Sequence, residues 1–132
     1  MSASPRTDWE ALRAAALEAR ERAYAPYSKF QVGAALLVSG RIFAGCNVEN
    51  ASYPVGTCAE RGALAAAIAA GCRDLQAVLV LGPTPIPPCG MCRQALAEFN
   101  AGVPVLLAGA DGGADIETSL AALLPNPFLP GA

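Results

Sequence analysis

Two short, continuous apolar runs, residues 77–81 and 103–108, flank a segment with the length of a helix, residues 90–99. A strand-length run without polar positions is typical of a strand buried on both faces, as in a parallel sheet. Parallel neighbours need a crossover, and a helix that ends at Gly102 supplies one. The pattern therefore predicts a βαβ unit with a right-handed crossover.

The first part of the chain predicts a helix followed by a hairpin. Thr7 and Glu10 have the spacing of a capping box, with Thr7 as the N-cap and Glu10 at N3. Residues 31–38 and 41–49 are strand-like, and the Ser-Gly pair between them predicts a tight turn. Along the second strand, alternation predicts one face in the core and another that carries Phe43, Asn47 and Glu49. The core face is expected to hold Ile42, Ala44, Cys46 and Val48.

Further elements follow along the chain. Residues 58–70 predict a helix closed by Gly71, residues 115–117 a short strand and residues 119–124 a last helix. No linker or internal repeat interrupts the sequence, so residues 1–132 are expected to form a single domain. The whole pattern predicts an α/β layered fold with a mixed sheet of about five strands.

The cysteines and the missing histidine limit the chemistry. The chain has five cysteines and no histidine. An odd cysteine count in a chain expected in the cytosol argues against a disulfide framework and favours metal binding or catalysis. Without histidine, Ser-His and Cys-His triads and HExxH zinc sites are excluded. Acid–base chemistry therefore falls to carboxylates, tyrosine, cysteine or lysine.

Charge and composition limit the partners. The formal net charge is -2, Lys29 is the single lysine, and the arginines are scattered, so a polymeric nucleic acid is not expected as a partner. An apolar content of 54% predicts contact with another subunit. Residues 1–10 hold no apolar stretch and no apolar run could span a bilayer. We therefore expect no signal peptide, no membrane association and a cytoplasmic location.

Two segments, Cys-Ala-Glu-Arg at residues 58–61 and Pro-Cys-Gly-Met-Cys-Arg-Gln at residues 88–94, each stand where a loop enters a helix. Cys58, Cys89 and Cys92 could bind one zinc ion as thiolates and leave a fourth position for water. Helix N-termini favour thiolates because the dipole and the free N–H groups stabilise negative charge.

Glu60 and Arg61 follow the first cysteine directly. A regular helix separates Cys58 and Glu60 by about 200°, so they share a site only if it lies beyond the helix N-terminus. Arg61 could donate hydrogen bonds to the thiolates and withdraw charge from them. The alternative is a structural site of four cysteines, in which Cys46 or Cys72 completes the ligand set.

With these motifs, the chain resembles the short cytidine deaminases from about residue 9 to residue 128. Further similar segments are residues 27–30 (YSKF), 33–37 (GAALL), 45–50 (GCNVEN) and 123–125 (LLP). The resemblance implies a three-layer α/β/α fold and zinc-dependent hydrolytic deamination of cytidine and deoxycytidine to uridine and deoxyuridine in pyrimidine salvage. Water, activated by zinc, attacks C4 of the base and ammonia leaves.

The resemblance also implies a role for each matching residue. Cys58, Cys89 and Cys92 are zinc ligands, Glu60 is the proton shuttle, Asn47 and Glu49 hold the ribose hydroxyls, Phe30 packs on the base, and the Ala59 backbone contacts the pyrimidine edge. Similar proteins of this length are homotetramers with composite sites, which implies that Tyr53 and Phe128 reach a neighbouring subunit. Gln31, Gly62 and a short loop at residues 82–88 depart from the family pattern and affect the expected loop shape.

Two rival functions remain open at this point. An aminonucleoside-antibiotic deaminase uses the same chemistry, although Asn47 with Glu49 favours a plain ribose. A non-catalytic binding module stabilised by zinc belongs to a different class, and release of ammonia separates it from an enzyme. A tRNA or DNA deaminase is disfavoured by the charge distribution.

Overall fold

A mixed sheet of five strands, in the order β2-β1-β3-β4-β5, forms the centre of the computed structural model. The structure describes residues 7–130, so most of the segment in which no signal peptide is expected lies outside the described residues. In chain order the elements are α1 (Trp9–Glu21), β1 (Gly33–Val38), β2 (Arg41–Cys46), η1 (Tyr53–Val55), α2 (Ala59–Ala69), β3 (Leu75–Gly82), α3 (Gly90–Ala97), β4 (Pro104–Gly109), β5 (Ile116–Ser119) and α4 (Leu120–Leu123).

The pairing within the sheet agrees with the predicted βαβ unit. Strands β3 and β4 are parallel and α3 connects them, whereas β1 is antiparallel to both β2 and β3. Strand β5 closes the other edge, antiparallel to β4. The sheet is therefore mixed, as the apolar runs and the hairpin predicted.

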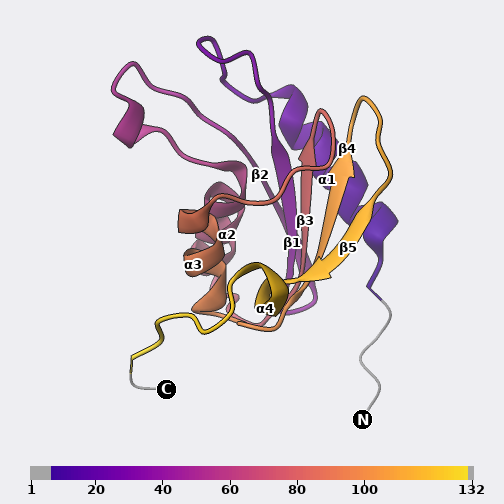
Figure 1. Ribbon diagram of the computed structural model, residues 1–132, viewed down its shortest axis with the longest axis vertical. Helices are drawn as coiled ribbons and strands as arrows, with labels where there is room; N and C mark the ends of the chain where they lie inside the picture. Colours follow the sequence, from indigo (N-terminus) through magenta and orange to yellow (C-terminus); the bar gives the residue numbers. More distant parts are fainter. Residues whose placement is uncertain (1–6, 131–132) are drawn as a thin grey trace.

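Helices cover both faces of the sheet, which gives three layers (Figure 1). Alternate residues of the strands supply the two cores, because successive side chains point to opposite faces. Leu36 and Val80 pack with α2 and α3 on one side, whereas Ala35 and Leu79 pack with α1 on the other. The two helices that carry the cysteine motifs, α2 and α3, therefore lie on the same face of the sheet.

The first helix begins one residue later than predicted. Asp8, not Thr7, is the N-cap, and its Oδ1 accepts a hydrogen bond from the N–H of Ala11 at 3.0 Å. The predicted capping box is therefore wrong, since Glu10 falls in the first turn at N2 instead of N3. Thr7 and Asp8 are both good caps, and the local pattern did not separate them.

The predicted burial of β2 is also reversed. Ile42 is 39% exposed, while Phe43 packs against the core cluster beneath α2. The reason is Gly45, where an added Cβ would lie 2.5 Å from the carbonyl oxygen of Ala59 and 2.5 Å from the nitrogen of Ala63. The face of Phe43 and Gly45 therefore packs against α2, whereas Ile42 and Ala44 on the opposite face are exposed.

Beyond Cys46 the second strand becomes irregular instead of continuing to residue 49. Val48 forms isolated bridges with Tyr24 and with Thr57. At the start of β2, the guanidinium of Arg41 lies 5.0 Å from the centre of the Phe43 ring.

Within residues 7–130, no helix is both long and apolar enough to cross a membrane.

Candidate active site

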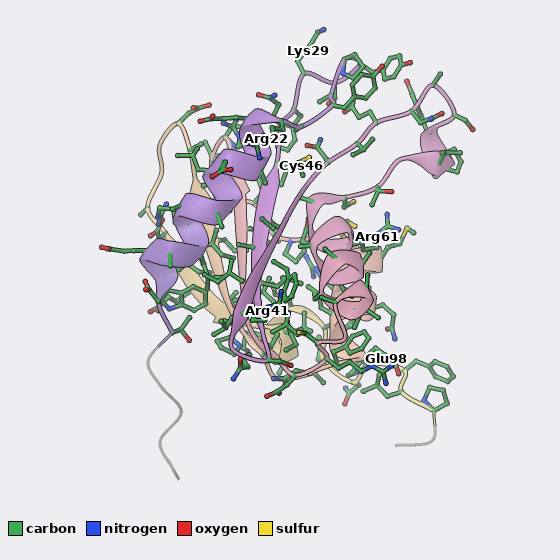
Figure 2. The ribbon with its side chains drawn as sticks, turned by 180° about the vertical axis from the view of Figure 1, so that it is seen from behind. Arg22, Lys29, Arg41, Cys46, Arg61 and Glu98 are labelled. Atoms are coloured by element: carbon green, nitrogen blue, oxygen red, sulfur yellow. The ribbon has the colours of Figure 1, made fainter. Side chains whose placement is uncertain are left out.

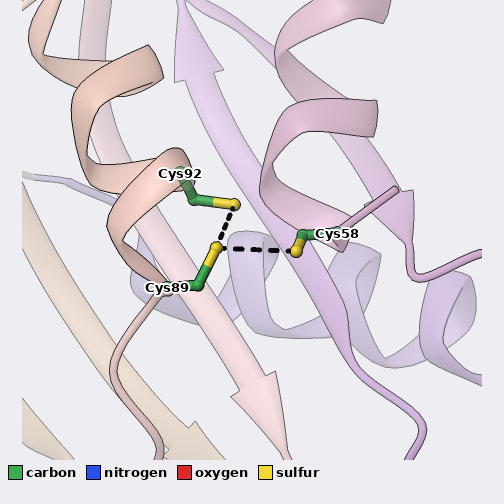
Figure 3. A group of neighbouring side chains, drawn as sticks. All are labelled: Cys58, Cys89 and Cys92. Carbon is green, nitrogen blue, oxygen red and sulfur yellow. Dashed lines mark hydrogen bonds between the residues drawn. The ribbon is translucent and has the colours of Figure 1, made fainter. Parts of the chain in front are cut away.

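Three cysteine side chains converge where α2 and α3 begin (Figure 3). Cys58 is the N-cap of α2, Cys89 is the N-cap of α3, and Cys92 lies in the first turn of α3. The Sγ atoms of Cys58 and Cys89 are 3.6 Å apart, and those of Cys89 and Cys92 are 3.4 Å apart. All three sulfurs lie within 4.8 Å of one another.

This sulfur triangle fits a tetrahedral metal ion. Zn–S bonds of about 2.3 Å in a tetrahedron place neighbouring sulfurs about 3.8 Å apart. The observed separations are close to that edge, and no further cysteine, aspartate or glutamate of the described residues joins the group. Cys46 and Cys72 lie elsewhere as free thiols, the latter 3.8 Å from Arg41 Nη1. The arrangement favours an open three-thiolate site over a closed site of four cysteines.

The electrostatics of the cluster favour a thiolate at Cys58. Its pKa is lowered to about 5, first by the neighbouring Cys92 thiol and then by Arg61. The pKa of Cys92 is raised, mainly by its interaction with Cys58 and by desolvation. Of the two thiols, Cys58 is therefore the more acidic.

Glu60 is the buried carboxylate beside the cluster. It is 4% exposed and lies in the first turn of α2. Its pKa is raised, chiefly by burial and further by the negative charge of Cys58. A carboxyl group tuned toward neutrality is able to accept and return a proton near neutral pH. The separation of about 200° expected on a helix does not keep Glu60 from the thiols, because the cluster lies at the helix start.

Arg61 faces the same cluster. Its Nη2 donates toward Cys58 Sγ at 4.0 Å, while its buried Nε has no partner in the part of the chain described. The thiolate of Cys58 raises the pKa of the guanidinium, which stays charged. The cation offsets part of the negative charge that three thiolates accumulate.

A cavity of about 600 Å³ opens beside the cluster. Its lining includes five predicted residues, Asn47, Glu49, Tyr53, Cys58 and Arg61. Phe30, 42% exposed, and Phe128, 75% exposed, are absent from the lining, and Ala59 is fully buried. Glu60, Cys89 and Cys92 lie next to Cys58 but do not line the cavity themselves. The structure thus gathers the expected ribose ligands at this cavity, and leaves both phenylalanines outside it within one chain.

Asn47 joins this cavity to the loop before β1. Its Oδ1 accepts a hydrogen bond from the N–H of Val32 at 2.9 Å, and its Nδ2 donates to the carbonyl of Phe30 at 2.7 Å. One hydrogen of the amide nitrogen and one lone pair of the oxygen remain for a ligand. Asn47 therefore orients the segment that carries Phe30.

Glu49 holds the same loop from its other end. Its Oε1 accepts hydrogen bonds from the N–H groups of Tyr27 and Ser28, at 3.0 and 3.1 Å. The Ser28 hydroxyl donates to Oε2 and accepts from the N–H of Phe30 at 3.0 Å. The bonds hold Lys29 at a φ of 61°, with its side chain pointing outward at the loop tip (Figure 2).

Sequence reasoning gave no role to several residues around the cavity. Tyr27 and Ser28 stood in a family-like segment, but their contact with Glu49 depends on a loop that folds back across the sheet end. Met91, between the two cysteines of α3, is 65% exposed and also lines the cavity. The signal available in the sequence was its position between two expected metal ligands, Cys89 and Cys92.

With the geometry established, comparison with known proteins defines the family. Residues 6–108 match the cytidine and deoxycytidylate deaminase zinc-binding region. The chain belongs to this cytidine and deoxycytidylate deaminase family.

Individual relatives are similar over nearly the whole chain. A cytidine deaminase of Sporosarcina psychrophila is 49% identical over 125 residues, which are 92% of this chain and 91% of the relative. The crystal structure of a cytidine deaminase from Burkholderia pseudomallei is 49% identical, with a TM-score of 0.85 over 93% of this chain and 100% of that one. A cytidine deaminase from Mycobacterium leprae is 38% identical, with a TM-score of 0.80 over 92% and 100% of the two chains. These likenesses agree with the predicted α/β fold.

Proposed function

We propose that this protein is a zinc-dependent hydrolase that converts cytidine and deoxycytidine to uridine and deoxyuridine and releases ammonia. The observation that carries the proposal is the buried carboxyl group of Glu60 beside three converging thiols, one of which, Cys58, lines the cavity. A carboxyl group and an open metal site are the two parts that hydrolysis of the C4 amine needs.

Cys58, Cys89 and Cys92 would hold the metal ion, as the sulfur spacing supports. When bound, zinc supplies the Lewis acid that makes water nucleophilic at neutral pH. Glu60 would accept one proton from that water and donate it to N3 of the base. It would then accept the remaining proton of the hydroxyl group now bonded to C4 and pass it to the amine, which leaves as ammonia while the C4 carbonyl forms. Its raised pKa supports this role, because the same group must both take and return a proton.

Asn47 and Glu49 bind the ribose hydroxyls in this proposal. After their contacts with the loop, Glu49 Oε2 keeps a free lone pair and Asn47 Nδ2 keeps a hydrogen, so each can still form a hydrogen bond with a sugar hydroxyl in the cavity. Phe30 packs on the base and the Ala59 backbone meets the pyrimidine edge. A plain ribose fits this pair better than the modified sugar of an aminonucleoside antibiotic.

We further propose a homotetramer with composite sites. Tyr53 is 80% exposed and lines the cavity, and Phe128 is 75% exposed on the C-terminal segment. Large aromatic side chains left this open are typical of surfaces that meet another subunit. Light scattering should give four chains per particle, and Phe128→Ala should weaken substrate binding; an active monomer would contradict the assembly.

We place the reaction in pyrimidine salvage and in the cytoplasm, where reducing conditions would keep the cysteines out of disulfides. The direct test is ammonia release from cytidine, deoxycytidine, cytosine, CMP and an aminonucleoside antibiotic. We expect turnover of the two nucleosides and one zinc per chain, with both lost in Cys89→Ala. Zinc binding without ammonia release from any substrate would instead support a non-catalytic binding module.

A further inference from the structure

Arg93 joins the turn that carries Cys89 to the end of the last helix. It follows Cys92 on α3 and is half-buried. Its Nε donates to the carbonyl of Pro88 at 2.8 Å, and its Nη1 donates to the carbonyl of Leu123 at 2.7 Å. Leu123 stands 30 residues later in the chain, so one side chain bridges two distant segments.

Both carbonyls lack a partner within a helix. The last carbonyls of α4 have none because the helix ends there. Pro88 precedes the N-cap, and the α3 hydrogen-bond ladder begins one residue later, where the Cys89 carbonyl accepts from the N–H of Arg93 at 3.0 Å. Among residues 7–130 no carboxylate pairs with Arg93, so its charge faces these carbonyl dipoles.

The Pro88 carbonyl determines where Cys89 points. The proline ring fixes φ of residue 88, and the direction of the carbonyl follows from ψ of the same residue. A hydrogen bond to Arg93 holds that ψ, and so both dihedrals before Cys89 are set. Packing does not do this, because Cys89 is exposed whereas Cys92 is fully buried.

We propose that Arg93 is a positioning residue that holds the Cys89 thiol in register with Cys58 and Cys92 and anchors this turn to the C-terminal segment. The next residue adds to the anchor, since Gln94 Nε2 donates to the carbonyl of Phe128 at 2.9 Å. The inference rests on the proposed zinc site, and it assigns metal retention to a residue that is not a ligand.

The experiment measures zinc release from the holoenzyme to a chromogenic chelator. Arg93→Met removes both hydrogen bonds at similar side-chain length, and Arg93→Gln keeps a single amide donor. We expect zinc to leave Arg93→Met roughly ten- to a hundredfold faster, the usual range for losing a group that orients a metal ligand. The rate of zinc release from Arg93→Gln should lie between the rates of Arg93→Met and the wild type. Cobalt-substituted Arg93→Met should show a shifted thiolate-to-metal absorption band.

Arg20→Met is the matched control. Arg20 also donates from Nε to a backbone carbonyl, that of Gln31 at 2.9 Å, but it lies on α1 across the sheet. The variant Arg20→Met should be less stable than the wild type but should release zinc no faster. Wild-type release rates in both Arg93 variants would overturn the inference; if Arg93→Met does not fold, the rate of Arg93→Gln decides. A wild-type protein that binds no zinc would instead refute the proposed function.

Discussion

Glu49 and Ser28 are joined by two hydrogen bonds: the Ser28 hydroxyl donates to Oε2 and the Ser28 N–H donates to Oε1, which also accepts from the neighbouring N–H of Tyr27. The carboxylate that is expected to bind ribose is therefore first a support for the loop that carries Phe30. Binding of the sugar and placement of the aromatic ring are coupled through this one side chain.

Ser28→Ala should raise the pKa of the Glu49 carboxyl toward its ordinary value. The Ser28 hydroxyl is the largest cause of the lowered pKa of Glu49, and the backbone N–H groups contribute less. Titration of the Glu49 carboxyl carbon by NMR measures the change directly. We also expect a severalfold higher KM for cytidine with little change in kcat, because the loop that carries Phe30 loses two bonds.

The control is Ser52→Ala, since the Ser52 side chain makes no capping hydrogen bond in the neighbouring turn. It should leave both the Glu49 titration and KM as they are. A Glu49 pKa unaffected by Ser28→Ala would show that the backbone donors alone set it.

Glu60→Gln should abolish most turnover while zinc and substrate binding persist. Glutamine keeps the size of the side chain but does not accept a proton. The turnover number should fall by at least roughly 10²–10⁴-fold, as for the loss of one general acid–base group. Affinity for a hydrated-pyrimidine transition-state analogue should fall much further than affinity for cytidine. Retention of more than about a tenth of turnover, with zinc bound, would refute a single proton shuttle.

The stability of the metal-free protein should depend on pH through Glu60. Because the folded-state pKa of Glu60 is raised above its ordinary value of 4.5, its contribution to stability is fully present below that value. It is lost as the pH rises through the folded-state pKa, where a charged carboxylate must stay buried. Glu60→Gln, always neutral, should therefore become more stable than the wild type as the pH rises.

Urea unfolding in the presence of a chelator, at pH 5 and pH 8, measures this difference. The urea midpoint of Glu60→Gln relative to wild type should be higher at pH 8 than at pH 5. Glu98→Gln, which changes an exposed carboxylate of the same type, should show no such dependence (Figure 2). An equal difference at both pH values for Glu60→Gln would contradict the burial argument.

Arg61→Ala should make zinc retention more sensitive to acid. The guanidinium helps to lower the pKa of Cys58, so its removal raises that pKa and lets protons compete better with the metal. The pH at which half of the zinc is lost should therefore move upward, as measured by zinc content after equilibration at each pH. Arg61→Lys keeps the charge and should move the midpoint less. An unchanged midpoint in Arg61→Ala would show that Arg61 does not tune the thiolates.

The parts of the fold that the sequence pattern predicted are those that local hydrophobicity decides. The apolar runs at residues 77–81 and 103–108 became β3 and β4, parallel as expected. The buried face of β2 was predicted wrongly because a partner distant in sequence decides it, namely α2, which rests on Gly45. The alternation of side chains along a strand defines its two faces, but it does not say which face the rest of the protein covers.

The candidate site divides in the same way. Residues within the two motifs, such as Cys58 and Cys92, were found from spacing, and the structure brings them together. Ser28 and Arg93 act through partners that are distant along the chain, at Glu49 and Leu123. Such pairs leave no periodic signal, so a single sequence does not reveal them.

Gly45 also sets how much mutation this site can tolerate. A single methyl group there would have to displace the backbone of α2 at Ala59 and Ala63, and Cys58 and Glu60 would move with it. Gly62, on the opposite side of the same contact, has its nearest atoms at 3.8 Å and can accept alanine. In a survey of all single substitutions, inactive variants should therefore cluster at Gly45 as strictly as at Glu60, although Gly45 has no side chain with which to touch the nucleoside.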